Sequence, residues 1–497
     1  MAEIASTSPP AEPDTAASNF GVGGALGKTG VAWAMLEWAR YPYYLLIVIF
    51  IFAPYFARDI IGADILASGA LEGLDPETAT QTANAQGQAA IASVTKWAGL
   101  IAALTAPFLG AALDRGGRRK PILAIMLGSI AVMSWLLWYA IPGEEGLPTT
   151  VVMIILVIAY VSYTYSEVTH NSMLTASGRP DSLSMISGMG LGLGNLAATI
   201  MFIGLVALFA LPAAIGWPFS EPQLGFDLAR YEHVRIAGPL CAAWLVLFSI
   251  PFFTSAKDPG VKGASWTMAA IDGARSVFRT VREAAKYAQL MKFLIARMLY
   301  ADAMAALLAL GAVYVSLFLE WGFLEMTAYA IFACAWGFLG GLVGGWLDKR
   351  VGVKLALILE IIGMVAVLVV QLSITNETLF YGLLDNYQVW NGVVFKDLSD
   401  IVYLAVASIL SVTAVASISS SRTMLVTLAP PGRSGEFFGL YAIAGTVTVW
   451  LGPLLVETFT TMFNSQRIGM ISITILFAMG LVILSSVRMQ DDQTTEA

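Results

Sequence analysis

Long apolar runs, separated by short polar segments, make up most of this chain of 497 residues. A helix that crosses the hydrocarbon core of a bilayer needs about 20 mostly apolar residues. Runs of this kind lie at 31–57, 88–113, 121–141, 149–175, 183–211, 238–255, 291–319, 327–347, 353–373, 399–424, 435–460 and 467–487. The pattern therefore predicts an all-α integral membrane protein with twelve transmembrane helices.

The segment 256–290 is too polar to cross a bilayer and divides the predicted helices into two sets of six. We expect a six-helix bundle at 31–255, a cytoplasmic linker helix at 256–290 and a second six-helix bundle at 291–488. We also expect a disordered cytoplasmic tail at 1–30 and a short cytoplasmic tail at 489–497. The basic residues of the linker suit contact with anionic headgroups, and a solvated linker helix is the alternative.

Lysine and arginine gather in alternate loops, and such loops stay preferentially on the cytoplasmic side of a membrane. The basic groups lie at 115–120, 257–286 and 349–354. Two of the opposite loops, at 59–77 and 144–145, carry acidic residues. We therefore expect a multi-pass protein of the cell (inner) membrane, with both termini in the cytoplasm.

The composition fits a membrane protein, because 58% of the residues are apolar and only 12% are charged. A soluble domain averages roughly 25% charged residues. The formal net charge of −7 is spread over loops and tails, so no nucleic-acid partner is expected. The two cysteines lie inside apolar runs, which gives neither a disulfide framework nor a metal motif. We expect no cofactor and no enzymatic activity, since no nucleophile–base pair or ATP-binding loop appears.

A loop signature occurs twice, after the second predicted helix of each half. The first copy is GAALDRGGRRK, with Asp114, Arg115 and Arg118, and the second is GGWLDKRVGVK, with Asp348. Both copies resemble the loop motif of the major facilitator superfamily. The resemblance implies two parallel six-helix repeats around a central site. The aspartates could face the positive end of a neighbouring helix and gate the site, whereas a purely topological role for the arginines is the alternative.

A narrower resemblance covers most of the chain. Residues 421–455 contain PPGRSGEFFGLY, with Arg433 and Glu436, followed by GPL. This block is similar to the vacuolar-effluxer-like (autophagy-related) branch of the superfamily, and so are WAMLEWA in the first helix and LYAD in the seventh. The resemblance implies a gating role for Arg433 and Glu436, and a transported solute of the amino-acid class. Glu37, Arg40 and Thr446 depart from the pattern expected for that branch, so the substrate cannot be copied from its best-known members.

Ionisable side chains inside a membrane are costly, so each one is a candidate functional residue. The fourth predicted helix carries a polar stripe at steps of three and four residues, formed by Tyr160, Tyr163, Thr164, Glu167, His170 and Asn171. A carboxylate with a histidine one turn away could couple transport to protons. The alternative is a Glu167–His170 pair that only fixes helix packing.

The first and seventh predicted helices add further candidates for a substrate or coupling site. Glu37 and Arg40 are spaced to pair on one helix, close to Tyr44. They form either an ion pair within one helix whose two charges only neutralise each other, or a pair that faces the cavity and takes part in substrate binding or gating. Tyr300 and Asp302 lie in the seventh helix, where Asp302 is deeper than Arg297 and is therefore harder to explain without a function.

Other intramembrane residues are interpreted more simply. Arg297 can extend to the headgroups, and the hydroxyl groups of the tenth helix serve mainly packing. Lys96, Glu360 and Glu457 are isolated in the sequence and receive no role. Glycines at four-residue spacing in the fifth and eighth helices suit either a moving interface between the halves or plain tight packing.

These observations favour alternating-access transport of a small polar or zwitterionic solute by a monomer in the lipid bilayer, with or without proton coupling. One alternative is a cation-coupled sugar symporter, but the second helix offers no carboxylate before Asp114, which disfavours sodium. Another is an exporter of amphipathic lipid-like or drug-like compounds, which the aromatic first helix would suit. A membrane enzyme and a scaffold without transport are disfavoured, the scaffold because of the paired loop motifs.

Overall fold

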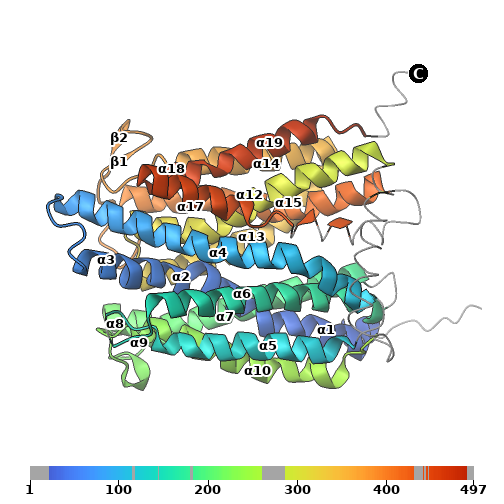
Figure 1. Cartoon of the computed structure of the whole chain (residues 1–497), viewed down its shortest axis with the longest axis horizontal. Helices are drawn as coiled ribbons and strands as arrows, with labels where there is room; N and C mark the ends of the chain where they lie inside the picture. Colours follow the sequence, from blue (N-terminus) through green and yellow to red (C-terminus); the bar gives the residue numbers. More distant parts are fainter. Residues whose placement is uncertain are drawn as a thin grey trace, which may run out of the picture.

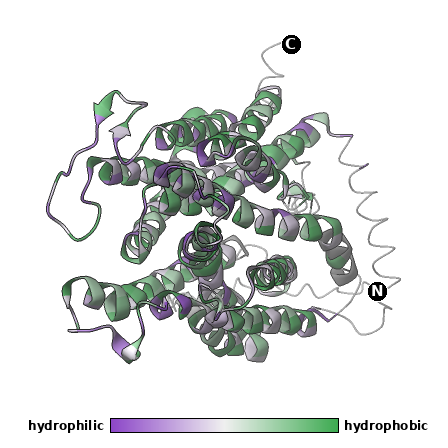
Figure 2. Ribbon diagram, turned by 60° about the vertical axis from the view of Figure 1, so that its left-hand side comes forward, coloured by the Kyte–Doolittle hydropathy of each residue, from purple (hydrophilic) through white to green (hydrophobic). Residues whose placement is uncertain are grey.

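The computed structural model describes residues 22–114, 118–143, 145–178, 183–259, 282, 286–429, 440–441, 444–445 and 447–489. Within these ranges the protein is almost entirely helical, as Figure 1 shows. The long helices run roughly parallel in two groups, and α4 passes between them. Figure 2 shows that these helices are predominantly hydrophobic along their lengths.

The first group contains the helices that precede residue 256, together with short turns of helix at their ends. Its principal elements are α1 (Val22–Tyr43), η1 (Tyr44–Phe50), α2 (Phe52–Tyr55), η2 (Phe56–Gly62), α3 (Ala63–Ala67), α4 (Pro76–Asp114), α5 (Arg119–Leu136), η3 (Leu137–Tyr139), α6 (Thr149–Ser172), η4 (Leu174–Ala176), α7 (Leu183–Leu205), η6 (Val206–Ala210), α8 (Leu211–Ile215), η7 (Gln223–Gly225), α9 (Glu232–Arg235) and α10 (Ala237–Ser255).

The second group follows the polar segment. Its elements are α12 (Ala288–Phe318), α13 (Phe323–Val351), α14 (Val353–Gln371), β1 (Thr378–Leu379), β2 (Leu384–Asp385), α15 (Leu398–Leu428), α17 (Leu451–Phe463), α18 (Gln466–Ile471) and α19 (Ile473–Ser485). The two short strands pair antiparallel in the connection between α14 and α15.

Ten of the helices among the described residues are long and apolar enough to cross a membrane. This finding confirms the all-α membrane class expected from the apolar runs. The long helix α4 covers the expected second span at 88–113. The eleventh span was expected at 435–460, but the described helix α17 begins only at Leu451, and residues 430–439 lie outside the described part of the chain.

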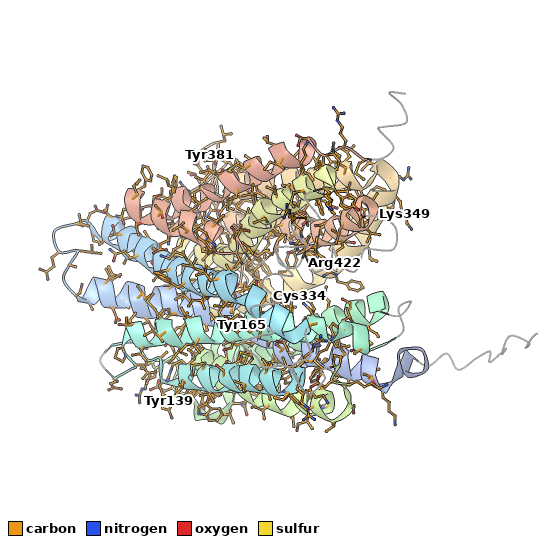
Figure 3. All side chains as sticks on the ribbon, turned by 45° about the vertical axis from the view of Figure 1, so that its right-hand side comes forward. Tyr139, Tyr165, Cys334, Lys349, Tyr381 and Arg422 are labelled. Carbon is orange, nitrogen blue, oxygen red and sulfur yellow. The ribbon has the colours of Figure 1, made fainter. Side chains whose placement is uncertain are left out.

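The ends of the helices differ in chemistry, and we name them by it. The basic end carries Arg118, Lys120, Lys349 and Arg350, and the hairpin end carries the strands β1 and β2. Figure 3 shows Lys349 at the right-hand end of the helices, and Tyr381, from the hairpin connection, on the upper edge away from that end. At the basic end, Asp258 accepts hydrogen bonds from the backbone N–H groups of Arg119 (3.1 Å) and Lys120 (3.0 Å). This carboxylate thereby caps the start of α5.

Glycines let helices approach closely inside each group. A Cβ atom on Gly194 of α7 would lie 2.8 Å from Cβ of Tyr41 in α1. A Cβ atom on Gly340 of α13 would lie 2.5 Å from the carbonyl oxygen of Val412 in α15. These glycines therefore serve tight packing within a group, one of the two interpretations of their spacing. Helices α7 and α13 also contact one another across the groups.

The two groups are joined mainly at the hairpin end. Arg58 in η2 donates to the carbonyl oxygen of Trp321 at 2.8 Å, and Asn84 in α4 donates to that of Leu317 at 3.1 Å. Asn464 donates to Thr82 Oγ1 at 2.8 Å. These hydrogen bonds, each of which joins described residues of the two groups, lie in the half of the helices nearer the hairpin end.

An ion pair also links the groups. Lys96 Nζ of α4 lies 2.6 Å from Glu457 Oε2 of α17, and both side chains are mostly buried. Because each of these residues is isolated in the sequence, no role is expected for either one. That interpretation was wrong, since the packing of α4 against α17 brings two distant charges together and neutralises both.

Candidate functional site

The first span, Gly27–Ala67, changes its helical geometry near its own middle. Pro42 lies inside α1, where it has no N–H to donate to the preceding turn, and a π-helix, η1, begins two residues later. Such π-helical turns are frequent at functional sites. Glu37 and Arg40 lie one turn before the change.

Glu37 and Arg40 form an ion pair that extends to the neighbouring helix. Arg40 Nη2 lies 2.6 Å from Glu37 Oε1, and Arg40 Nη1 donates to Ser166 Oγ of α6 at 3.2 Å. The guanidinium also lies over the ring of Tyr163, 4.8 Å from its centroid. Arg40 is only 1% exposed. The pair is thus part of a larger polar cluster between α1 and α6.

His170 completes this cluster. Its ring is fully buried and stacks on Trp33, with centroids 4.0 Å apart. Its Nδ1 lies 3.2 Å from Glu37 Oε1, and its Nε2 lies 3.0 Å from the carbonyl oxygen of Trp33. The sequence predicted a pair with Glu167, one turn away, but the structure pairs His170 with Glu37. The reason is that the α1–α6 contact turns the imidazole toward α1.

The cluster of Glu37, Arg40 and His170 has room for one proton beyond that of a neutral imidazole. Both ring nitrogens face oxygen atoms that can only accept hydrogen bonds if Glu37 is ionised. Both contacts are therefore satisfied only when His170 is doubly protonated or when the Glu37 carboxyl group carries a proton. The arrangement can hold a proton at a fixed place between two helices.

Glu167 occupies a different environment, although it belongs to the same polar stripe. Its side chain and that of Asn171 are exposed, whereas His170 is fully buried. Glu167 interacts electrostatically with Arg40, Glu37 and Arg422 of α15. It therefore lies on the side of α6 that faces the second group of helices.

Arg422 is the residue that the sequence analysis did not select. It follows a run of serines in the tenth predicted helix, where nothing local distinguishes it. Its side chain is exposed and lies close enough to Glu167 for electrostatic interaction. Figure 3 shows Arg422 at the boundary between the two groups of helices.

Three tyrosine rings pack against one another beside Arg40. Tyr44 stacks on Tyr163, with ring centroids 5.3 Å apart and ring planes 12° apart. The ring centroid of Tyr43 lies 5.6 Å from that of Tyr163. The expected members Tyr44 and Tyr163 therefore come together with Glu37 and Arg40.

Tyr300 and Asp302 belong to the second group and do not contact the cluster around His170. Asp302 Oδ2 accepts a hydrogen bond from the Gly452 N–H at 3.0 Å, in the first turn of α17. A carboxylate at this place stabilises the start of a helix. The hydroxyl of Tyr300 lies 2.7 Å from Ser421 Oγ. These contacts explain why both side chains are buried in α12.

The residues expected to gate the site are only partly described. Arg115, Arg433 and Glu436 lie outside the described residues, and Asp114 is the last residue of α4, with its side chain also outside the description. Arg118 is exposed at the basic end. Asp348 lies three residues before the end of α13, and its Oδ1 has no hydrogen-bond partner among the described residues.

Glu360 is another carboxylate whose hydrogen-bond partner could not be predicted from the local sequence. It is 3% exposed in α14, and its Oε1 accepts a hydrogen bond from Ser420 of α15 at 3.0 Å.

The part of the chain that the structure describes contains no group of three or more His, Cys, Asp or Glu residues suited to a metal ion.

Comparison with known proteins agrees with this architecture. Residues 29–496 match the family model described as "Vacuole effluxer Atg22 like". The chain is 23% identical over 474 residues to an uncharacterised major-facilitator-type transporter, YxiO, of Bacillus subtilis, covering 92% of this chain and 94% of that protein. It is 22% identical over 327 residues to autophagy-related protein 22-1 of Sclerotinia sclerotiorum, covering 62% of this chain and 50% of the fungal protein.

Solved structures show the same fold at low sequence identity. The nucleoside transporter NupG superposes with a TM-score of 0.57 at 13% identity, over 92% of this chain and 98% of that one. A bacterial homologue of the human lysosomal transporter Spinster, in an inward-facing and unoccupied conformation, gives 0.56 at 12% identity, over 92% and 95%. A D-xylose–proton symporter gives 0.56 at 10% identity, over 92% and 97%.

Proposed function

Because the chain belongs to the Atg22-like vacuole effluxer family and is a membrane transporter of the major facilitator type, we propose that it carries a small zwitterionic solute by alternating access. Amino acids are the proposed solute class. The observation that carries this proposal is the placement of both charge signs on the space between the groups, with Glu167 on one side and Arg422 on the other. A zwitterion offers the complementary charges, and charged side chains at membrane depth are rare outside such sites.

The opening of this space is proposed to lie at the basic end. Hydrogen bonds between described residues of the two groups lie at the hairpin end, such as that from Arg58 to Trp321. Glu167 and Arg422 lie in the half of their helices nearer the basic end, and both are exposed. Basic loops favour the cytoplasmic side, so the proposed opening faces the cytoplasm. Alternating access then requires the groups to separate at the hairpin end and meet at the basic end.

Proton linkage is proposed to act through Glu167. This carboxylate faces the open space and can exchange protons with water there, whereas His170 is fully buried. Its charged and titratable neighbours are Glu37, Arg40 and Arg422. The phenol groups of Tyr41, Tyr44, Tyr160 and Tyr163 also interact with it electrostatically. Protonation of Glu167 would remove the charge opposite Arg422 and lower the cost of moving the two groups past one another.

The test is uptake by the purified full-length chain in proteoliposomes, with radiolabelled leucine, glutamine, lysine, uridine and xylose as separate solutes. We expect uptake of an amino acid that an inward proton gradient accelerates, and no uptake of xylose. Glu377→Gln, which changes an exposed residue of the hairpin connection, is the matched control for Glu167→Gln. Uptake of xylose or uridine alone would replace the amino-acid assignment, and absence of flux for every solute would contradict the proposed function.

A further inference from the structure

A second polar pocket lies in the second group of helices, away from the cluster around His170. It is a small, partly open recess between α12, α15 and Tyr441. Its lining consists of Arg297, Tyr300, Ala301, Met304, Ser417, Ile418, Ser421, Arg422 and Tyr441. We call it the arginine pocket, because its two charged lining residues are both arginines.

The described residues that line the arginine pocket bring positive charge and no carboxylate. Arg422 is exposed and makes no hydrogen bond or ion pair with a described residue. Arg297 Nη1 donates to the carbonyl oxygen of Tyr441 at 2.7 Å, and the guanidinium lies 3.4 Å from the centroid of the Tyr441 ring. None of the described residues that line the pocket is acidic. Two cations inside a membrane span call for an anion.

Arg297 does not extend toward the headgroups, as its position in the sequence suggested. Its guanidinium is turned inward onto Tyr441. Gly445 makes this placement possible, because a Cβ atom there would lie only 2.7 Å from Arg297 Nη1. The glycine and the inward arginine are thus parts of one arrangement.

Hydroxyl groups supply neutral donors at the same place. Tyr300 and Tyr441 both place their hydroxyls on Ser421 Oγ, at 2.7 Å and 3.0 Å. These three groups form a connected network directly beside the two guanidinium groups. Hydroxyl donors beside cations are suited to hold a carboxylate in one orientation.

The backbone next to the pocket is irregular, which is a separate observation that points to a ligand. Gly445 and residues 447–450 form turns, and the helix α17 starts only at Leu451. Thr448 Oγ1 donates to the carbonyl oxygen of Met298 in α12 at 2.8 Å, which fixes these turns against α12. At membrane depth, non-helical backbone is tolerated only when it is buried in protein or lines a water-filled cavity. In transporters, interrupted helices of this kind border binding sites.

We propose that the arginine pocket binds the carboxylate of the transported solute, with Arg422 as the principal partner and Arg297 as its support. Glu167, in the opposite group of helices, then accepts a hydrogen bond from the ammonium group of the same molecule, which its carbonyl oxygen can do whether or not the carboxyl group is protonated. The assignment rests on the proposed function and names the part of the solute that each half of the protein recognises. A guanidinium binds a carboxylate through two parallel hydrogen bonds, so the geometry distinguishes Arg422 from lysine.

The test compares an amino acid with its amide on the purified full-length protein in lipid nanodiscs, by thermal shift and equilibrium binding. The ligands are leucine, leucinamide, glutamine, glutaminamide and inorganic phosphate. We expect the acids to bind and the amides to bind about 10- to 100-fold more weakly, as expected for loss of a charge-assisted bidentate contact. Arg422→Gln should abolish the preference for the acid, and Arg422→Lys should retain part of it. Arg230→Gln, at an exposed pair with Glu145, is the control.

A charge-restoration variant keeps the test decisive if Arg422→Gln does not fold. Arg422→Cys is made in a Cys334→Ser background and treated with aminoethyl methanethiosulfonate, which returns a positive charge to position 422. We expect acid binding to be absent before treatment and recovered after it. Equal binding of acid and amide by the unmodified protein would overturn the proposal, and so would phosphate binding that outcompetes the acids. Arg422-dependent acid binding without flux would instead contradict only the proposed transport function.

Discussion

Glu37 is the acceptor on which the buried cations of α1 and α6 depend. Its Oε1 lies 2.6 Å from Arg40 Nη2 and 3.2 Å from His170 Nδ1. Removal of one partner from a buried ion pair leaves an uncompensated charge, whereas removal of both is far less costly. The residue is therefore placed to stabilise the fold as well as to hold a proton.

We expect Glu37→Gln to destabilise the protein by about 3 kcal/mol, since Arg40 would lose its counter-ion. The measurement is thermal unfolding of the detergent-solubilised chain, with Glu377→Gln as the exposed control. The double variant Glu37→Gln with Arg40→Met should recover most of the loss. An unchanged melting temperature in Glu37→Gln would show that the pair is not important for stability.

Glu167 should behave in the opposite way, because it is exposed in the space between the groups and has no hydrogen-bond partner among the described residues. We expect Glu167→Gln to change stability by less than about 0.5 kcal/mol while it flattens the pH dependence of uptake. Initial rates between pH 5.5 and 8 in proteoliposomes provide the measurement. Transport by this variant with the pH profile of the unmodified protein would exclude Glu167 as the coupling group.

At the scale of elements, two adjacent glycines of α13 differ in the atoms that surround them. Gly340 packs against the backbone of α15, whereas nothing lies within 4 Å of a Cβ atom on its neighbour Gly341. The two glycines are adjacent in one helix but face different surroundings. Alanine substitutions at these positions therefore distinguish the effect of packing from the effect of helix propensity.

Gly340→Ala should destabilise the protein by about 1–3 kcal/mol, because the new methyl group meets the carbonyl oxygen of Val412. Gly341→Ala should instead stabilise it by about 0.5–1 kcal/mol, since alanine favours the helix and the space is open. Thermal unfolding of the two variants side by side tests the difference. Similar effects at both positions would contradict the close contact of α13 with α15.

The ion pair of Lys96 and Glu457 also acts between helices, because it joins α4 to α17. We expect Lys96→Met to cost about 2–3 kcal/mol, as it strands a mostly buried carboxylate, and the double variant with Glu457→Gln to recover much of it. A double-mutant cycle on thermal stability gives the coupling energy. Additive effects of the two substitutions would mean that the pair contributes no interaction.

At the scale of the whole molecule, closure of the hairpin end depends on contacts between the two groups. Arg58 is held by Asp59 and donates to the carbonyl oxygen of Trp321, just before α13 begins. Ser316 lies behind this contact and is only 1% exposed. Its accessibility therefore reports on opening at the hairpin end.

Arg58→Gln should increase the rate at which a cysteine at position 316 reacts with a membrane-impermeant maleimide, about tenfold for each 1.4 kcal/mol removed from the closed state. The Ser316→Cys reporter is placed in a Cys334→Ser background, and the protein is labelled in nanodiscs so that both faces are reached. Arg230→Gln, which breaks an exposed pair at the same end, should leave the rate unchanged. Equal rates with and without Arg58 would show that this contact does not hold the end closed.

The sequence alone determined the membrane class and the family. The length of an apolar run is set by bilayer thickness, and a duplicated loop motif can be recognised in isolation, so both depend only on local residues. The same local reasoning selected Glu37, Arg40, Tyr44 and Tyr163, which the structure brings together around His170.

Only the tertiary structure decided which charges meet. His170 pairs with Glu37 on another helix rather than with Glu167 on its own, and Lys96 finds Glu457 in the other half of the chain. Asp302 caps a helix that starts later than its apolar run predicts. The physical reason is that partners depend on how each helix is rotated and where it is interrupted, and both follow from long-range packing rather than from the pattern along one segment.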